Sequence, residues 1–177
     1  MRGATPRDAP AIARVHQECW RTTYSGILPA AVIAEAAGRK SEAVWRQRLN
    51  GTLAGQATWL AVGPAGDVLG FASCGAARHR LQGLEAEVYA LYVLQEHQRR
   101  GIGASLLGEC ARHFVRHGLF GFYLWALKAN RARLFYEALG GEAVAEKSER
   151  LGRHSYLEVA YAWHEVGPLV GRPEAVR

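Results

Sequence analysis

The sequence of 177 residues predicts an α/β (α+β) fold, a mixed and mainly antiparallel central sheet flanked by helices on both faces. Stretches with apolar residues at helical spacing alternate with short β-branched and aromatic runs. The turn Pro64–Asp67 joins two of these runs as a hairpin, so that pair of strands is expected to be antiparallel. A strand-helix-strand unit in the second half predicts a right-handed parallel crossover.

The first helix has a clear start signal. Thr5 can cap it, Pro6 suits the first helical position, and Asp8 follows as the capping-box partner. Apolar residues then recur at helical spacing until Ser25-Gly26, where the helix is expected to end. Further helices are predicted at residues 29–37, 41–49, 103–117 and 131–139, the last stopped by two glycines.

The strands are predicted from short apolar runs between turn residues. They are expected at residues 58–62, 68–73, 87–94, 122–127, 143–146 and 155–163. Periodicity is lost after Trp163, so we expect a single domain over residues 1–166 and a loose tail over residues 167–177. A chain of this length accommodates one domain.

Composition excludes several classes of protein. Hydrophobic residues make up 49% and charged residues 21%, which is typical of a soluble globular chain. No apolar run approaches the ~20 residues that span a bilayer, and the N-terminus carries no stretch of signal-peptide type. The three cysteines are scattered, with no CxxC motif or Cys/His cluster, so we predict no metal and no disulfide. These features favour a cytoplasmic protein without a membrane partner.

The formal net charge of +6 admits three interpretations: a solvated basic surface, a nucleic-acid partner, or a local site for a phosphorylated ligand. No basic helical run is present, which disfavours nucleic acid. The pair Arg99 and Arg100 lies beside a glycine-rich segment, which favours the local site.

This segment, 98–104, reads QRRGIGA and follows a strand directly. Glycines let the backbone approach a ligand closely. The unpaired N–H groups of the following helix turn, together with the helix dipole, suit a phosphate or pyrophosphate. The Walker pattern is absent, and Leu106 replaces the last glycine of the dinucleotide-binding pattern, so neither of those sites is expected.

Two segments together resemble the GNAT family of acyl-CoA-dependent N-acetyltransferases. Gln98–Gly103 is similar to that family's Q/R-x-x-G-x-G/A loop, and Arg131–Gly141 (RARLFYEALGG) is similar to its second signature. The resemblance extends from about Ala4 to Trp163. It departs from the family at Ala129, where an asparagine is common; here Asn130 follows one residue later.

The resemblance implies acetyl-CoA as co-substrate. The strand before the loop would pair with the pantetheine arm, and the loop would hold the pyrophosphate. The implied cofactor-binding residues are Leu91, Tyr92, Val93, Gln98, Arg99, Arg100, Gly101, Ile102, Gly103, Ala104, Asn130 and Tyr136.

The implied reaction is attack of an amine on the acetyl thioester, which needs a proton acceptor, an oxyanion donor and an acid for the thiolate. Tyr136 matches the tyrosine of the second signature and is the candidate acid. Glu87 opens the strand of the thioester site and is the candidate base, directly or through water. The Val93 N–H is the candidate oxyanion donor. The resemblance also implies that the end of the first helix forms part of the amine pocket, so Trp20 and Tyr24 are candidates to contact the substrate, as is Glu87.

The leading hypothesis is therefore an N-acetyltransferase that transfers acetyl from acetyl-CoA directly to an amine of a small molecule or peptide. The alternative is a catalytically silent acyl-CoA-binding regulatory module on the same fold, because fold does not fix function. Acceptor specificity is expected from residues 27–55, and a homodimer is compatible with the sequence.

Overall fold

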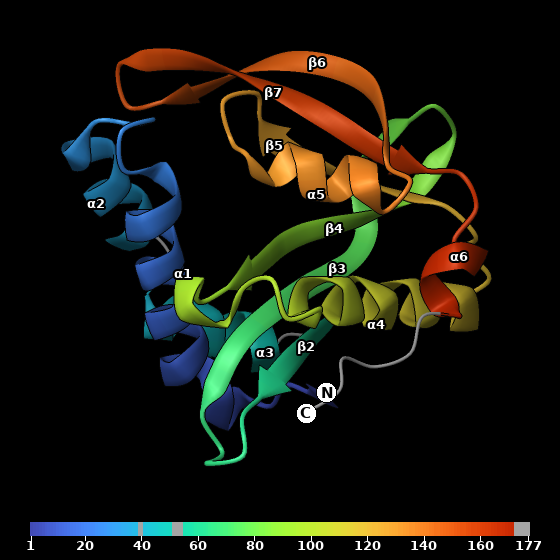
Figure 1. The fold of residues 1–177 in the computed structure, drawn as a ribbon, viewed down its shortest axis with the longest axis horizontal. Coiled ribbons are helices and arrows are strands. Elements are labelled where there is room, and N and C mark those ends of the chain that lie inside the picture. The colour runs from blue at the N-terminus through green and yellow to red at the C-terminus, as the bar shows by residue number, and fades with distance from the viewer. Residues whose placement is uncertain (39–40, 51–54, 172–177) are drawn as a thin grey trace.

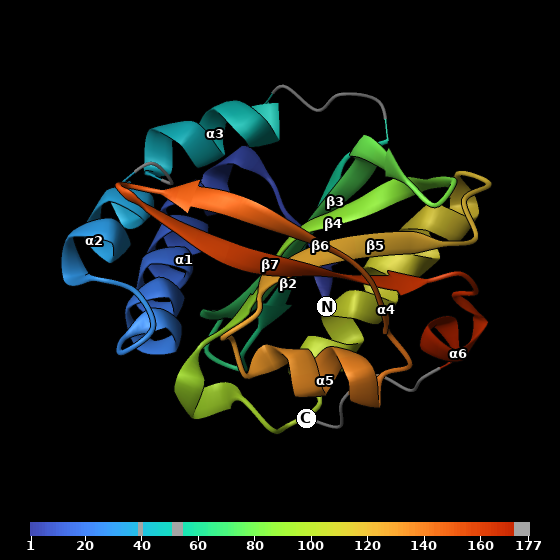
Figure 2. The same ribbon diagram turned by 90° about the horizontal axis from the view of Figure 1, so that it is seen from above.

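The computed structural model describes residues 1–38, 41–50 and 55–171. A seven-stranded sheet of order β1-β2-β3-β4-β5-β7-β6 forms its centre. All neighbouring strands are antiparallel except β4 and β5, so the expected mixed, mainly antiparallel sheet is confirmed. Helices cover both faces, with α1–α3 on one side and α4 and α5 on the other (Figures 1 and 2).

The first half of the chain supplies one helical layer and the hairpin. The elements are β1 (Arg2–Gly3), a 3-10 turn (Pro6–Asp8), α1 (Ala9–Tyr24), α2 (Ala30–Gly38), α3 (Glu42–Asn50), β2 (Ala57–Val62) and β3 (Val68–Leu81). The predicted capping box is present: the Thr5 N–H donates to Asp8 Oδ2 at 2.8 Å and the Thr5 hydroxyl at 2.9 Å. Strand β3 is longer than predicted, because it continues to a second hairpin with β4.

The second half supplies the crossover and a long terminal hairpin. Its elements are β4 (Leu84–Val93), a 3-10 turn (Gln95–His97), α4 (Ile102–Arg116), β5 (Phe122–Leu127), α5 (Ala132–Ala138), β6 (Glu142–Leu151), β7 (His154–Trp163) and α6 (Gly167–Val170). Strands β4 and β5 are parallel and α4 connects them, as the crossover prediction required. Strand β6 extends well beyond the predicted residues 143–146.

The expectation of a loose tail was wrong for its first part. Residues 167–170 form α6, and Leu169 is buried at 1% exposure in the main core. Arg112 of α4 donates from Nη1 to the Val170 carbonyl at 3.1 Å. The apolar side chain of Leu169 stabilises this turn against α4, which the loss of sequence periodicity did not reveal. The rest of the expected tail, residues 172–177, lies outside the described residues.

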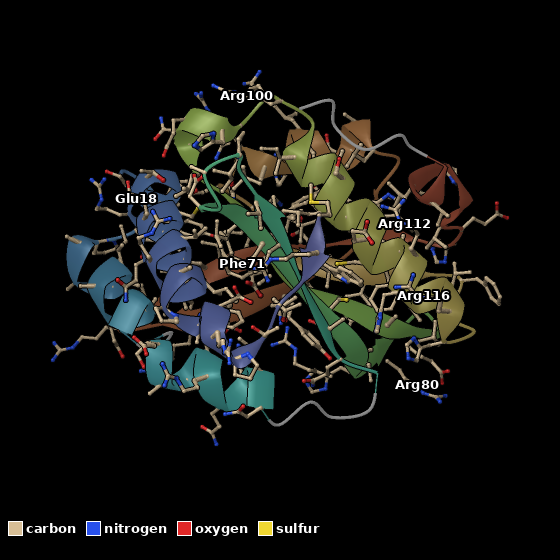
Figure 3. All side chains as sticks on the ribbon, turned by 90° about the horizontal axis from the view of Figure 1, so that it is seen from below. Glu18, Phe71, Arg80, Arg100, Arg112 and Arg116 are labelled. Carbon is tan, nitrogen blue, oxygen red and sulfur yellow. The ribbon has the colours of Figure 1, made fainter. Side chains whose placement is uncertain are left out.

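Two apolar layers hold the sheet. Residues of α4 and α5 pack with one sheet face around Leu106, Phe114 and Phe122. Residues of α1 and α3 pack on the other face around Ile12, Trp45 and Phe71. In Figure 3, Phe71 lies at the centre of the molecule, while Arg112 and Arg116 follow α4. No helix in the described part of the chain is both long and apolar enough to cross a membrane.

A smaller cluster joins the end of the terminal hairpin to the first helical layer. Tyr24, Leu28, Val32 and Leu127 are buried together, with Tyr156 packed against them. The β6–β7 hairpin therefore reaches across to α1 and α2, as Figure 1 shows. This cluster closes one end of the molecule between α1 and the sheet.

Candidate active site

The site begins where two parallel strands separate. Strands β4 and β5 share one registered pair, Glu87 with Tyr123. Just beyond it, the ladder between β3 and β4 shifts: Ser73 pairs with Ala90 but Cys74 pairs with Val88. Tyr89 is the extra residue of this β-bulge, and bulges increase the local bend and twist of a strand. The bend moves the end of β4 away from β5 and opens a cleft.

The cleft is lined by two strands of the sheet and by segments beside them. Strands β4 and β5 contribute Val88, Tyr89, Ala90, Leu91, Tyr92, Val93, Leu124, Trp125 and Ala126. Helix α1, the glycine loop and the α5 region contribute Cys19, Thr23, Tyr24, Gln98, Asn130, Ala132 and Tyr136. Seven candidates from the sequence therefore line one cleft: Tyr24, Leu91, Tyr92, Val93, Gln98, Asn130 and Tyr136.

Backbone donors of β4 face the cleft. The Leu94 N–H donates to the Leu69 carbonyl of β3 at 2.9 Å. Successive N–H groups of a strand point to opposite edges, so the Val93 N–H points away from β3 and toward the cleft. The Gln98 side chain donates from Nε2 to the Val93 carbonyl at 3.0 Å, which ties the glycine loop to the end of the strand.

The loop before α4 has an unusual backbone. Arg99 has φ 62° and Gly101 has φ 78°, both in the left-handed region. Residues in such conformations turn successive N–H groups into a concave anion-binding arrangement. The positive φ suits Gly101 without cost, whereas Arg99 adopts it at a cost in backbone strain. Figure 3 shows Arg100 at the edge of the molecule on this loop.

Gly103 is required for a second reason. A Cβ placed there would lie 3.1 Å from Cζ of Phe135, so the first turn of α4 packs closely on α5. Ile102, Gly103 and Ala104 belong to this turn and do not line the cleft. The two family-like signatures, distant in sequence, thus meet through Gly103 and Phe135.

Tyr136 lines the cleft on the α5 side. It is 7% exposed, and burial raises the pKa of its phenol well above the usual value. The hydroxyl therefore stays protonated over the physiological range, as a proton donor must. Its ring contacts Phe135 and Tyr161 at centroid distances of 5.4 and 5.7 Å.

Asn130 is held at the start of α5. Its Oδ1 accepts the Ala132 N–H at 2.9 Å, and the side chain is 8% exposed. Burial raises the pKa of the Tyr24 phenol, and hydrogen bonds with Tyr92 and Asn130 reduce this rise. Asn130 therefore joins α5 to the aromatic end of the cleft, one residue after the position expected from the resemblance.

Trp20 lies behind the cleft wall rather than in it. Its Nε1 donates to the Tyr92 hydroxyl at 2.9 Å, and its ring lies 4.6 Å from that of Tyr24. Tyr24 does line the cleft. Of the two aromatic candidates for the amine pocket, Trp20 supports the wall and Tyr24 forms it.

Glu87 is buried at 1% exposure beside the cleft and is absent from its lining. Its carboxylate accepts from the Arg78 backbone N–H at 3.1 Å and from the Arg78 guanidinium through Nε and Nη2. The Tyr123 hydroxyl lies 3.3 Å from Oε2. The negative charge of the carboxylate is thus already compensated by Arg78. The sequence did not reveal this pair, because the register between β3 and β4 brings the two residues together.

Sequence reasoning missed Tyr89 and Trp125. Alternation alone indicates one face for each strand residue, and the bulge breaks alternation at Tyr89. It also missed the histidine pair His113 and His117, four residues apart on α4 with ring centroids 4.4 Å apart. His113 Nε2 bonds the Gly55 carbonyl, and no group of three or more potential ligands occurs among the described residues.

Comparison with known proteins places these features in context. The sequence model of the Acetyltransferase (GNAT) family matches residues 11–140. The chain is 34% identical to the uncharacterized N-acetyltransferase YuaI of Bacillus subtilis, over 96% of this chain and 95% of that protein. It is 32% identical to the probable N-acetyltransferase Rv2775 of Mycobacterium tuberculosis, over 77% and 76% of the two chains.

Solved structures show the same fold. The crystal structure of PaiA N-acetyltransferase from Thermoplasma acidophilum in complex with coenzyme A superposes with a TM-score of 0.67. The two sequences are 18% identical, and the match covers 89% of this chain and 95% of the PaiA chain. At this identity the likeness establishes the fold alone.

Proposed function

The chain belongs to the GNAT family of acetyltransferases, and on that premise we propose that its cleft transfers acetyl from acetyl-CoA to an amine. The separation of β4 from β5 beyond Glu87 and Tyr123 carries the proposal, because it exposes strand N–H groups between two helical layers. An extended ligand arm can pair with them as an added strand.

The glycine loop would hold the pyrophosphate. The left-handed residues Arg99 and Gly101 and the first N–H groups of α4 provide donors, and Arg100 adds charge. The Leu91 and Val93 N–H groups would serve the pantetheine arm and the thioester oxygen, where an oxyanion develops. The Tyr92 N–H points toward β3, because successive N–H groups alternate between the two edges of the strand, and its hydroxyl accepts from Trp20.

Tyr136 is proposed as the acid for the departing thiolate. Its phenol is buried, protonated and in the cleft lining. A positioned acid of this kind contributes typically ~10²–10⁴-fold to the rate.

Glu87 is proposed as the acceptor of the amine proton. Since its carboxylate does not line the cleft, a water would carry the proton to it. Glu158 is a second carboxylate near this end; burial raises its pKa, and it is paired with Lys147 at 3.3 Å. We place the base at Glu87 because its ion-pair partner Arg78 lies over the ring of Tyr89, which lines the cleft.

Transfer is proposed to be direct. Cys19 is the one cysteine in the cleft lining, and burial raises the pKa of its thiol to about 12. A protonated thiol is a weak nucleophile. Cys74 and Cys110 are fully buried in the core. The amine therefore attacks the thioester itself, with no acetyl-enzyme.

We further propose that the enzyme is cytoplasmic and uses no metal; its three cysteines are free, as a reducing compartment favours. A homodimer stays an expectation. The catalytically silent module is disfavoured, because the matched relatives are named N-acetyltransferases and Tyr136 lies in the cleft lining.

The test combines calorimetry with acetyl-CoA and a thiol-release assay over a broad panel of amines. Tight binding together with acetyl transfer to at least one amine supports the proposal. Binding without transfer to any amine would indicate the silent module, and absence of binding would contradict the assignment of the cleft.

A further inference from the structure

A guanidinium lies beside Tyr89, at the end of the cleft where we propose that the amine binds, and a buried carboxylate holds it there. Arg78 donates through Nε and Nη2 to the buried Glu87, and its guanidinium lies 5.4 Å from the ring centre of Tyr89. Tyr89 lines the cleft. The Arg78 side chain nevertheless remains 61% exposed. Arginine has five N–H donors, and among the described residues nothing bonds Nη1.

A second guanidinium stands close by. Arg48 of α3 lies 5.4 Å from the ring centre of Trp45, and within the described ranges it has no carboxylate partner. Burial, and then the charge of Arg78, lower the pKa of Arg48. Glu87 compensates the charge of Arg78, so among the described residues the charge that lacks a counterion is that of Arg48, and an anion bound to Nη1 of Arg78 would also be attracted by Arg48.

The other charges of this region are already compensated. Glu87 forms an ion pair with Arg78. Lys147 forms an ion pair with Glu158 at 3.3 Å, and its Nζ also lies 4.3 Å from the ring centre of Trp125. Arg48 is therefore the uncompensated cation of this end of the site, within the part of the chain that the structure describes.

We infer that the acceptor is an aminocarboxylate, a small amine that also carries a carboxylate or a similar oxyanion. This inference rests on the proposed function. The oxyanion would be bound by Arg48 and by Nη1 of Arg78, in the manner of charge-assisted arginine–carboxylate pairs. Its amine would then lie beside Glu87 and Tyr89, facing the thioester.

The transfer step balances on these residues. The amine nitrogen forms a bond to the acetyl carbon while the bond from that carbon to sulfur breaks. The nitrogen's proton passes through water to Glu87, and the CoA thiolate takes a proton from Tyr136. Amines with several positive charges and no anion fit poorly, since the uncompensated Arg48 would repel them.

The experiment measures acetyl transfer, and binding to the CoA-loaded protein, for amino acids beside their amides and for polyamines. We expect amino acids to be preferred over their own amides. Arg48→Gln should raise the KM for the preferred aminocarboxylate by roughly 10- to 100-fold, since hydrogen bonds to charged groups contribute about that factor. The KM for acetyl-CoA should not change.

Arg46→Gln is the matched control. It removes the same charge two residues away on α3, where Arg46 pairs with Glu42 on the surface. Arg78→Lys tests the other cation while retaining a positive partner for the buried Glu87. Equal effects of Arg48→Gln and Arg46→Gln would overturn the inference.

The acceptor panel separates failure of the inference from failure of the function. Transfer to polyamines or amides in preference to amino acids would overturn the aminocarboxylate while leaving the acetyltransferase intact. Binding of CoA with neither turnover nor binding of any amino acid would overturn it as well. Loss of acetyl-CoA binding itself would instead contradict the proposed function.

Discussion

Among the described residues, Glu87 and Tyr123 are the one pair that joins β4 to β5 in register, and the Tyr123 hydroxyl lies 3.3 Å from Glu87 Oε2. The cleft opens beyond this pair because Tyr89 is inserted into β4 as a bulge. The Glu87 carboxylate also forms an ion pair with Arg78. One buried residue therefore contacts both Tyr123 of β5 and the guanidinium that lies beside Tyr89.

Gly101→Val should weaken acetyl-CoA binding by at least about tenfold, because a β-branched residue strains the left-handed backbone and fills the anion-binding loop. Gly66→Val is the matched control: Gly66 has φ 84° in the β2–β3 turn, with nothing near its added Cβ. Calorimetry measures the affinity for acetyl-CoA. Thermal unfolding measures the loss of stability that both variants share, because each places valine at a positive φ. Undiminished affinity in a folded Gly101→Val protein would remove the loop from the site.

Tyr136→Phe should lower kcat by ~10²–10⁴-fold with acetyl-CoA affinity nearly unchanged, because only the acidic proton is lost. Tyr161→Phe is the control, since the Tyr161 hydroxyl donates to Glu137 at 2.8 Å outside the cleft lining. Steady-state kinetics at saturating substrate decide the matter. Wild-type turnover in Tyr136→Phe would exclude it as the acid.

Incubation with acetyl-CoA alone should give no stoichiometric acetyl adduct by intact-protein mass spectrometry. The Cys19 thiol, with a pKa raised to about 12 by burial, is protonated at neutral pH. Cys19→Ala should accordingly retain turnover. A kinetically competent acetyl-cysteine would contradict direct transfer.

Glu87→Gln should lower kcat by ~10²–10⁴-fold and flatten the rise of rate with pH, because the amide cannot take the amine proton. Glu158→Gln is the comparison. Burial raises the Glu158 pKa, so a base at that position would make the rate rise with pH through this raised value. If only Glu158→Gln abolishes the rise, the base is Glu158 and not Glu87.

Asp8→Ala should lower the free energy of unfolding by about 1 kcal/mol at neutral pH through loss of the cap. The hydrogen-bonded Arg2 guanidinium holds the pKa of Asp8 well below its usual range. The ionised Asp8 carboxylate therefore stabilises the folded protein at pH values above about 3.9, the pKa of aspartate in the unfolded chain. This stabilisation is lost as the pH falls through the lower pKa that Asp8 has in the folded protein. Urea unfolding at several pH values should show the difference between variant and wild type shrinking in acid. A constant difference would exclude the carboxylate as its source.

Much of the architecture is local and could be predicted. The Thr5–Asp8 capping box, the turn after β2 and the strand-glycine-helix succession at residues 98–104 depend on residues near one another in the chain. Backbone conformation and apolar periodicity determine such features directly. The expectation that Tyr136 and the glycine loop belong to one site has another source, the resemblance of two short segments to signatures of the GNAT family.

The charge pattern at the amine end could not be predicted in this way. The Arg78–Glu87 pair depends on the β3–β4 register and its bulge, and the approach of Arg48 depends on the packing of α3 against the sheet. Register and helix docking are set by burial of apolar surface across the whole domain, and a shift of one residue exchanges the two faces of a strand. The sequence by itself therefore determined most of the elements and the position of the glycine loop, whereas only the tertiary structure decided that Arg78 pairs with Glu87 and that Trp20 lies behind Tyr24.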